Sequence, residues 1–123
     1  MKSYKELIVW QRAMELVELV YTLTNNFPKQ EMYGLTSQIR RSAVSIPSNI
    51  AEGKFRHSTK DFKRFLQIAF ASGAELETQI ELSKRMEYIN EEEFRDIQLV
   101  LNEVMKMLNA LLTKFSNIAN LAN

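Results

Sequence analysis

Hydrophobic residues recur at intervals of three and four along four long segments of this chain, which is the spacing of amphipathic helices. The first segment runs from Ser3 to Thr24, and the second from about residues 30–33 to Gly53. The third follows Ser58 and the fourth follows Asn90. Because short turns join helices that run in opposite directions, the pattern predicts an all-α fold, an antiparallel up-down-up-down four-helix bundle.

Capping residues stand where three of these helices are expected to begin. Ser3 and Glu6 resemble a capping box, and Asp61 stands three residues after Ser58. Asn90 precedes three glutamates, whose charges suit the positive end of a helix dipole. Gly53 is well placed to end the second helix.

The third and fourth segments carry regular apolar stripes that we expect to face the core. Gly73 lies on the third stripe, and its missing side chain predicts the close approach of another helix. The fourth stripe keeps a heptad-like repeat along most of its segment. The third stripe comprises Phe62, Leu66, Ala69, Gly73, Leu76, Ile80 and Ser83. The fourth comprises Phe94, Ile97, Leu101, Val104, Leu108, Leu111, Phe115 and Ile118.

Two parallel stripes share the segment 38–53, one apolar and one polar. The apolar stripe consists of Ile39, Ala43, Ile46, Ile50 and Gly53. The polar seam beside it consists of Gln38, Ser42, Ser45, Asn49, Glu52 and Arg56. Within it we predict bonds across helices or subunits that set their register, made by Gln38, Ser45, Asn49 and Glu52. Glu52 has two interpretations, a salt bridge to Arg41, Arg56 or another chain's arginine, and a ligand site.

Pro47 lies in the middle of the same segment. It lacks an N–H group and crowds the carbonyl of Ala43, so a helix that continues through it must bend. In the alternative, one helix ends before Pro47 and another begins there. The apolar stripe continues in phase from Ile46 to Ile50, which favours one second helix, kinked at Pro47.

Composition agrees with a single helical domain over residues 1–123, with a tail at 117–123 that we expect to fray. The chain has only three glycines and two prolines, and helix-favouring residues are abundant. The first seven residues carry charges where a signal peptide needs an apolar run, and no stretch has the length of a membrane span. We therefore expect a cytoplasmic protein without membrane contact.

Few residues in this chain are suited to catalysis or metal binding. There is no cysteine, and the single histidine, His57, stands in a connection between helices. These residues predict no metal cluster, no catalytic triad and no cofactor, and Glu75, Glu77 and Glu81 do not share one face of their helix. We expect a protein that is not an enzyme.

Positive charge is concentrated in one part of a nearly neutral chain, whose net charge is +1. Residues 38–64 contain seven cations and two anions, whereas residues 65–103 contain three cations and nine anions. Such a cluster suits a phosphate backbone, and Phe55 or His57 could stack on an unpaired base. A solvated surface is the alternative. The candidate nucleic-acid residues are Arg40, Arg41, Lys54, Arg56, Lys60, Lys63 and Arg64.

More apolar side chains occur than one bundle can cover. Six lie outside the main stripes, namely Ile8, Leu19, Val44, Ala51, Ile68 and Leu99. Because so much exposed apolar surface is unusual, they predict a homo-oligomer, and a closed ring would cover each copy's surface with the next.

The string from Leu35 to Gly53, which includes Ser45-Ile46-Pro47-Ser48-Asn49-Ile50-Ala51-Glu52-Gly53, resembles the signature of the bacterial four helix bundle family. That family is also called the 23S rRNA intervening-sequence protein or S23 ribosomal protein family. The segments 7–11, 27–28, 33–35, 65–69 and 75–79 resemble other parts of its pattern, so the similarity extends to about Ile89. The last helix is similar only in its apolar pattern.

The resemblance implies an antiparallel four-helix bundle that assembles into a pentameric ring. It also implies a link to nucleic acid, because some members are encoded inside intervening sequences of 23S rRNA genes. A related accessory factor of diversity-generating retroelements binds nucleic acid and a reverse transcriptase, although this chain differs from it in being nearly neutral. We therefore expect a homopentamer that binds RNA through the basic residues. The alternative is a scaffold ring that holds a protein partner and has no affinity for nucleic acid.

Overall fold

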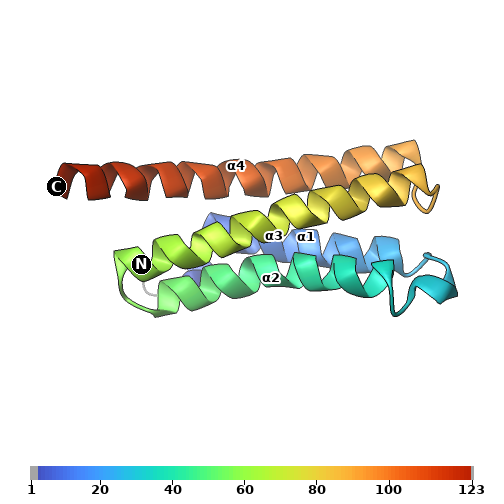
Figure 1. The fold of residues 1–123 in the computed structure, drawn as a ribbon, viewed down its shortest axis with the longest axis horizontal. Coiled ribbons are helices and arrows are strands. Elements are labelled where there is room, and N and C mark those ends of the chain that lie inside the picture. The colour runs from blue at the N-terminus through green and yellow to red at the C-terminus, as the bar shows by residue number, and fades with distance from the viewer. Residues whose placement is uncertain (1–2, 123) are drawn as a thin grey trace.

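Four α-helices make up the body of the protein in the computed structural model, which describes the backbone of residues 3–122 and the side chains of residues 3–117. They are α1 (Ile8–Thr24), α2 (Leu35–Phe55), α3 (Thr59–Arg85) and α4 (Glu91–Ala122). Short 3₁₀ turns precede α1 at Tyr4–Glu6 (η1) and α2 at Lys29–Glu31 (η2). The ribbon reverses along its long axis at each connection (Figure 1). No strand occurs in the described backbone, which confirms the predicted all-α, four-helix class.

Each helix contacts its neighbours in the chain, and α4 returns to contact α1. One end of the bundle therefore brings together η1, the end of α2, the start of α3 and the later part of α4 (Figure 1). The third stripe, from Phe62 to Ser83, is buried throughout. In the fourth stripe Ile97, Leu101, Val104 and Leu108 are buried, whereas the side chain of Ile118 lies outside the described residues.

Three predicted helix boundaries are wrong. The hydroxyl of Ser3 accepts from the Lys5 N–H at 3.1 Å and so caps η1, while α1 begins only at Ile8 because Leu7 is extended. Helix α2 begins at Leu35, after Gly34, because residues 29–31 form the separate turn η2. It also continues past Gly53 to Phe55, since Gly53 is buried against α3 and does not adopt a left-handed conformation.

The other two predicted N-caps are confirmed. The Ser58 hydroxyl accepts from the Asp61 N–H at 3.2 Å. At the start of α4, the side chain of Asn90 accepts from the Glu93 N–H at 2.8 Å, and the Asn90 N–H donates to the Glu93 carboxylate at 2.9 Å. This reciprocal pair satisfies two backbone donors that the helix start leaves free.

Helix α2 is uninterrupted at Pro47, which is buried within it, so the prediction of one continuous helix is confirmed. The bend expected at Pro47 stays a prediction. Fraying from Asn117 onward also stays a prediction: the backbone is helical to Ala122, while Asn123 and the side chains after Asn117 lie outside the described residues.

Two hydrogen bonds join α2 to α3 along the polar seam. The Ser45 and Ser72 hydroxyls lie 2.8 Å apart, and the Ser42 hydroxyl donates to the Glu75 carboxylate at 2.5 Å. Ser42 precedes Ser45 by three residues on α2, whereas its partner Glu75 follows Ser72 by three residues on α3. The two helices therefore run in opposite directions. Ser42 is buried, so these contacts fix the register of the two helices from inside the interface.

Two more polar contacts tie other parts of the bundle together. The phenol of Tyr88 donates to the Glu31 carboxylate at 2.8 Å, joining the connection after α3 to η2. This hydrogen bond, with burial as a smaller cause, raises the pKa of Tyr88. Between α1 and α4, the guanidinium of Arg12 donates to Glu103 at 2.7 Å and also pairs with Glu15. The Arg12 hydrogen bond lowers the pKa of Glu103 below its ordinary value of 4.5.

We predict that Glu103→Gln weakens the acid sensitivity of the bundle. Because folding lowers the pKa of Glu103, its contribution is present above pH 4.5 and is lost as the pH falls through the lowered value. Urea midpoints at neutral pH and below pH 4 would therefore differ less in Glu103→Gln than in wild type. Glu77→Gln, a change at an exposed residue of α3, is the control. If the urea midpoint fell by the same amount on acidification in wild type and in Glu103→Gln, the prediction would be contradicted.

Four of the six apolar residues predicted to lie outside the core are exposed, namely Ile8, Val44, Ile68 and Leu99. Leu19 is partly buried and packs against the core instead, and Ala51 is partly buried. Among the described residues, none of the helices combines the length and the apolar character that a bilayer crossing requires.

Candidate nucleic-acid interface

The connection between α2 and α3 is only three residues long, and its conformation follows from local chemistry. Arg56 ends α2 with helical angles, and its N–H bonds the Gly53 carbonyl at 3.3 Å. His57 then adopts a φ of 61°, the left-handed conformation that reverses the chain after a helix. Ser58 is extended and caps α3. The side chains of the last turn of α2 and the first turns of α3 consequently lie close together.

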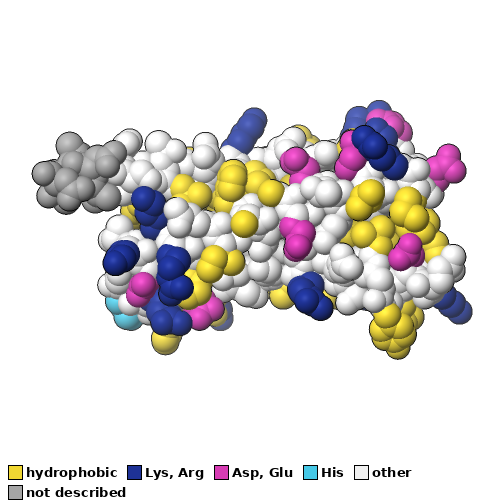
Figure 2. Space-filling model, viewed as in Figure 1, with side chains coloured by type: hydrophobic (Ala, Val, Ile, Leu, Met, Phe, Trp, Pro, Cys, Tyr) yellow, Lys and Arg dark blue, Asp and Glu magenta, His cyan; other side chains and the backbone are white. Residues whose placement is uncertain are grey.

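Five cations cluster on this turn, and we call them the basic patch: Lys54, Arg56, Lys60, Lys63 and Arg64. Dark blue side chains gather over this end of the molecule, with the histidine beside them (Figure 2). Two anions, Glu52 and Asp61, lie in the same stretch of sequence. Only Glu52 makes an ion pair among the described residues of this stretch, with Arg56 at 3.0 Å. The patch therefore keeps a net positive charge.

Aromatic rings underlie three of these cations. The guanidinium groups of Arg56 and Arg64 lie 5.2 and 4.7 Å from the ring centroid of Phe65, which is 7% exposed. The Lys54 ammonium lies 5.7 Å from the Phe62 ring. Cation–π contacts of this kind contribute about 0.5–1 kcal/mol each at exposed sites, enough to favour one orientation of the side chains. Phe55, 72% exposed, supplies an uncovered ring beside them.

The structure does not place Arg40 and Arg41 with the other predicted cations. They precede Lys54 on α2 by 14 and 13 residues, which is about 20 Å of helix at about 1.5 Å per residue. Arg40 donates to Thr24 at 2.9 Å and to Asn25 at 3.2 Å, and it lies over the Tyr21 ring. Arg40 thus holds α1 against α2. The length of α2 separates these two arginines from the other five cations. The predicted set of seven cations is therefore two separate groups.

The four residues predicted to set register behave differently within one chain. Ser45 makes a hydrogen bond to another helix, to Ser72. Asn49 donates back to the carbonyl and hydroxyl of Ser45, and Glu52 pairs with Arg56, so both bond within α2. Gln38 is exposed, while Ser42, its neighbour on the seam, reaches α3. Bonds from these residues to another subunit stay a prediction.

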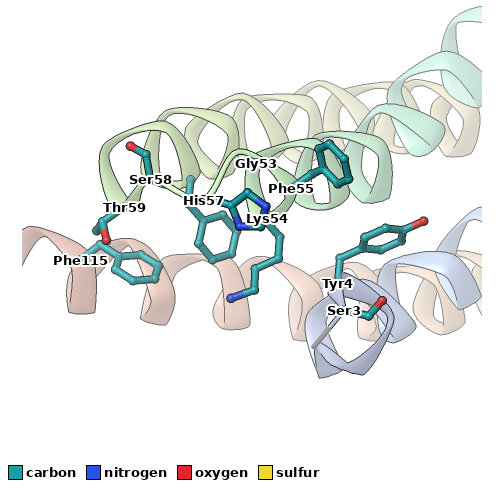
Figure 3. Close-up of a pocket in the computed structure, with 10 residues that line it drawn as sticks. Ser3, Tyr4, Gly53, Lys54, Phe55, His57, Ser58, Thr59 and Phe115 are labelled. Atoms are coloured by element: carbon teal, nitrogen blue, oxygen red, sulfur yellow. The ribbon is translucent and has the colours of Figure 1, made fainter. Parts of the chain in front are cut away.

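A pocket of about 510 Å³ opens next to the basic patch. Its lining comes from four separate parts of the chain: Ser3 and Tyr4 before α1, Gly53 to Phe55 at the end of α2, His57, Ser58, Thr59 and Phe62 at the turn, and Phe115 of α4. Figure 3 shows Lys54 and His57 in the middle of this group, between Phe115 and Tyr4. The sequence prediction did not include this pocket, because no local pattern relates Tyr4 or Phe115 to the turn.

Acidic and histidine side chains form no metal-binding arrangement in the described part of the chain. Besides Glu52 and Asp61, the side chains at this end of the bundle supply cations, hydroxyl groups and aromatic rings. Cations suit phosphate groups and rings suit bases, which together are the requirements of a single-stranded nucleic acid.

Comparison with known proteins places the chain in a family. The family model described as 23S rRNA-intervening sequence protein matches residues 5–110. No curated protein is similar in sequence. The crystal structure of a protein of unknown function from the S23 ribosomal protein family of Bacteroides thetaiotaomicron is 32% identical, with a TM-score of 0.74. The alignment covers 85% of this chain and 98% of that one. Over nearly the whole bundle, therefore, this chain belongs to the 23S rRNA-intervening sequence protein family.

Proposed function

We propose that this protein is a non-enzymatic homo-oligomer, a pentameric ring of four-helix bundles, that binds single-stranded or structured RNA through the basic patch. The observation that carries the proposal is the grouping of five cations, with the exposed Phe55, where α2 turns into α3. Lys60, Lys63 and Arg64 make no ion pair within the described residues, so their charges are available to phosphates. The family name agrees with a role near ribosomal RNA.

Oligomer formation would make a modest patch effective. One patch of five cations on a chain of net charge +1 binds weakly, because counterion release grows with the number of phosphates neutralised. Several identical patches on one frame gain avidity, by about 10² to 10⁴ where the RNA reaches two of them at once. The exposed side chains Ile8, Val44, Ile68 and Leu99 supply the apolar surface that contact between subunits would cover.

The test is to replace Lys60, Lys63 and Arg64 together by glutamate. We expect RNA affinity to fall at least about 100-fold and the salt dependence to lose about two units of slope, at about 0.7 per phosphate contact. The matched control replaces Lys29, Arg95 and Lys106, which are exposed and lie outside the patch, and gives the same change in net charge. Fluorescence anisotropy at several salt concentrations measures both variants, and circular dichroism checks their helicity.

Equal losses of affinity in the two triple variants would show that only net charge matters, and they would contradict the proposal. Unchanged affinity in the patch variant would exclude this surface. A second candidate function, a scaffold ring for a protein partner, is favoured by Met32 and Tyr33, which are 53% and 94% exposed and are not among the residues assigned to contact between subunits. Purification of a ring whose protein partners survive nuclease treatment, with no affinity for RNA, would support the scaffold.

A further inference from the structure

The pocket beside the basic patch has the size of a ligand site. Its volume of about 510 Å³ falls within the range of about 300–1,000 Å³ that small-molecule sites occupy. Because it is built from η1, both sides of the α2–α3 turn and α4, its shape depends on the folded bundle and not on one mobile loop. A single nucleotide is a ligand of matching dimensions.

Aromatic rings form the apolar part of this pocket. The rings of Phe62 and Phe115 lie 5.3 Å apart in a tilted arrangement, one from α3 and the other from α4. Tyr4 contributes a third ring from the opposite side, and it is held edge-on against Trp10 with centroids 5.4 Å apart. Phe62 is only 8% exposed and lies under the Lys54 ammonium, so the partly exposed rings of Tyr4 and Phe115 are the flat surfaces on which a planar base can stack.

Cationic and hydroxyl groups form the polar part. Lys54 and His57 lie between Tyr4 and Phe115 in Figure 3, with Ser58 and Thr59 at the turn beside them. No carboxylate lines this pocket among the described residues. An ammonium group, an imidazole N–H and hydroxyl groups are the kinds of donor that phosphate oxygens accept from.

The backbone of His57, which also reverses the chain between α2 and α3, adds a further observation. Its φ of 61° is uncommon for a residue with a Cβ, and glycine would adopt it without strain. Strained backbone conformations of this kind cluster at active sites and ligand-binding clamps, where the surrounding structure holds them. Here the conformation turns the chain at the rim of the pocket and places an imidazole among its lining residues.

From these observations we propose that the pocket binds a nucleoside 5′-monophosphate, with the base against the aromatic rings and the phosphate at Lys54 and His57. The ligand has two sources, the 5′-phosphorylated end of an RNA strand and a free mononucleotide. For the RNA end, the inference rests on the proposed function, because the rest of the strand would continue onto the adjacent basic patch. For the free mononucleotide, it is independent of RNA binding.

Two probes distinguish these sources. A 3′-labelled RNA oligonucleotide is titrated with a 5′-phosphate and with a 5′-hydroxyl, and adenosine 5′-monophosphate is titrated alone by NMR. We expect the phosphorylated end to bind at least about tenfold more tightly, as one or more charge-assisted hydrogen bonds would provide. In the variant His57→Gly, which keeps all five cations of the basic patch, this preference should fall, while the salt-dependent binding to the patch remains.

The charge-reversal variant of Lys60, Lys63 and Arg64 is the complementary control, because none of the three lines the pocket. If it loses RNA but still binds the mononucleotide, the pocket is a site in its own right. If wild type binds the mononucleotide but not RNA, the proposed function fails and the pocket proposal stands for the free ligand. Equal affinity for the two oligonucleotides, with no response to the mononucleotide, would overturn the pocket proposal. Thr59→Val is a second, conservative variant, expected to weaken the 5′-phosphate preference.

Discussion

Replacing Gly53 by alanine is expected to destabilise the bundle, although alanine is the better helix former. A Cβ at residue 53 would lie 2.7 Å from the Cβ of Phe65 and 3.4 Å from the Cα of Phe62. These atoms belong to or adjoin the backbone of α3, so α2 and α3 must move apart to admit a methyl group. Overpacking costs about 3 kcal/mol at the upper end of its usual range, and helix propensity returns about 1, which leaves a net loss of about 2 kcal/mol.

Gly73 provides the matched comparison. A Cβ at that residue would overlap Met105, chiefly its Sδ atom. This confirms the predicted close approach of another helix. Methionine has three rotatable bonds and adapts readily, so Met105 can move aside. We expect Gly73→Ala to stay within about 1 kcal/mol of wild type, since the propensity gain offsets the adjustment.

Urea unfolding followed by far-ultraviolet circular dichroism measures both alanine variants. Protomer concentration must be held constant, because assembly into an oligomer makes apparent stability depend on it. A Gly53→Ala protein as stable as wild type would show that α2 and α3 can separate slightly without cost. A loss as large in Gly73→Ala would show that Met105 cannot move. Either result would contradict the distinction drawn between backbone-linked and flexible neighbours.

Replacing Gln79 by methionine is expected to stabilise the protein by about 1–2 kcal/mol, against the usual direction of core substitutions. Gln79 is 6% exposed, and its side-chain carbonyl oxygen has no hydrogen-bond partner among the described residues. An unpaired buried polar atom costs about 1–3 kcal/mol, and methionine of similar shape removes it. Gln79 lies one turn beyond Glu75 on α3. It therefore follows Ser72 and Glu75, which bond the polar seam of α2, along the same side of the helix.

The control for Gln79→Met is Gln79→Glu, which keeps the shape but places a charge in the same buried environment. It should lower the urea midpoint, because an unpaired buried charge is costly. A destabilised Gln79→Met protein would contradict the prediction, and it would indicate that the oxygen has a partner in the assembled protein. Measurement across a range of protein concentrations would then locate that partner, since a bond between subunits gains effect with concentration.

The sequence predicted most of the fold because its strongest signals are local. A stripe such as Phe62 to Ser83 is buried because a helix of about 3.6 residues per turn must present it to one side. The caps at Ser58 and Asn90 act within four residues, so they could also be predicted from the sequence. The errors occurred where packing overrides local preference. Gly53 lies where Phe62 and Phe65 leave no space for a side chain, so this glycine serves close packing against α3 and does not end α2.

The candidate site was predicted less completely, for a physical reason. The patch from Lys54 to Arg64 spans one short turn, so sequence proximity implied spatial proximity. Arg40 and Arg41 are equally near in sequence to the end of α1, where Arg40 bonds Thr24 and Asn25, and only packing decides between these surroundings.

Local periodicity and capping thus determined the helices, their buried faces and the composition of the basic turn from the sequence itself. The tertiary structure alone decided which distant residues meet, because the lengths and reversals of four helices set their relative positions. It joins Tyr4 and Phe115 to the turn at Lys54 and His57 as one pocket. It also separates Arg40 from that turn by more than half the length of α2. Such meetings depend on the packing of whole helices, which no short stretch of sequence specifies.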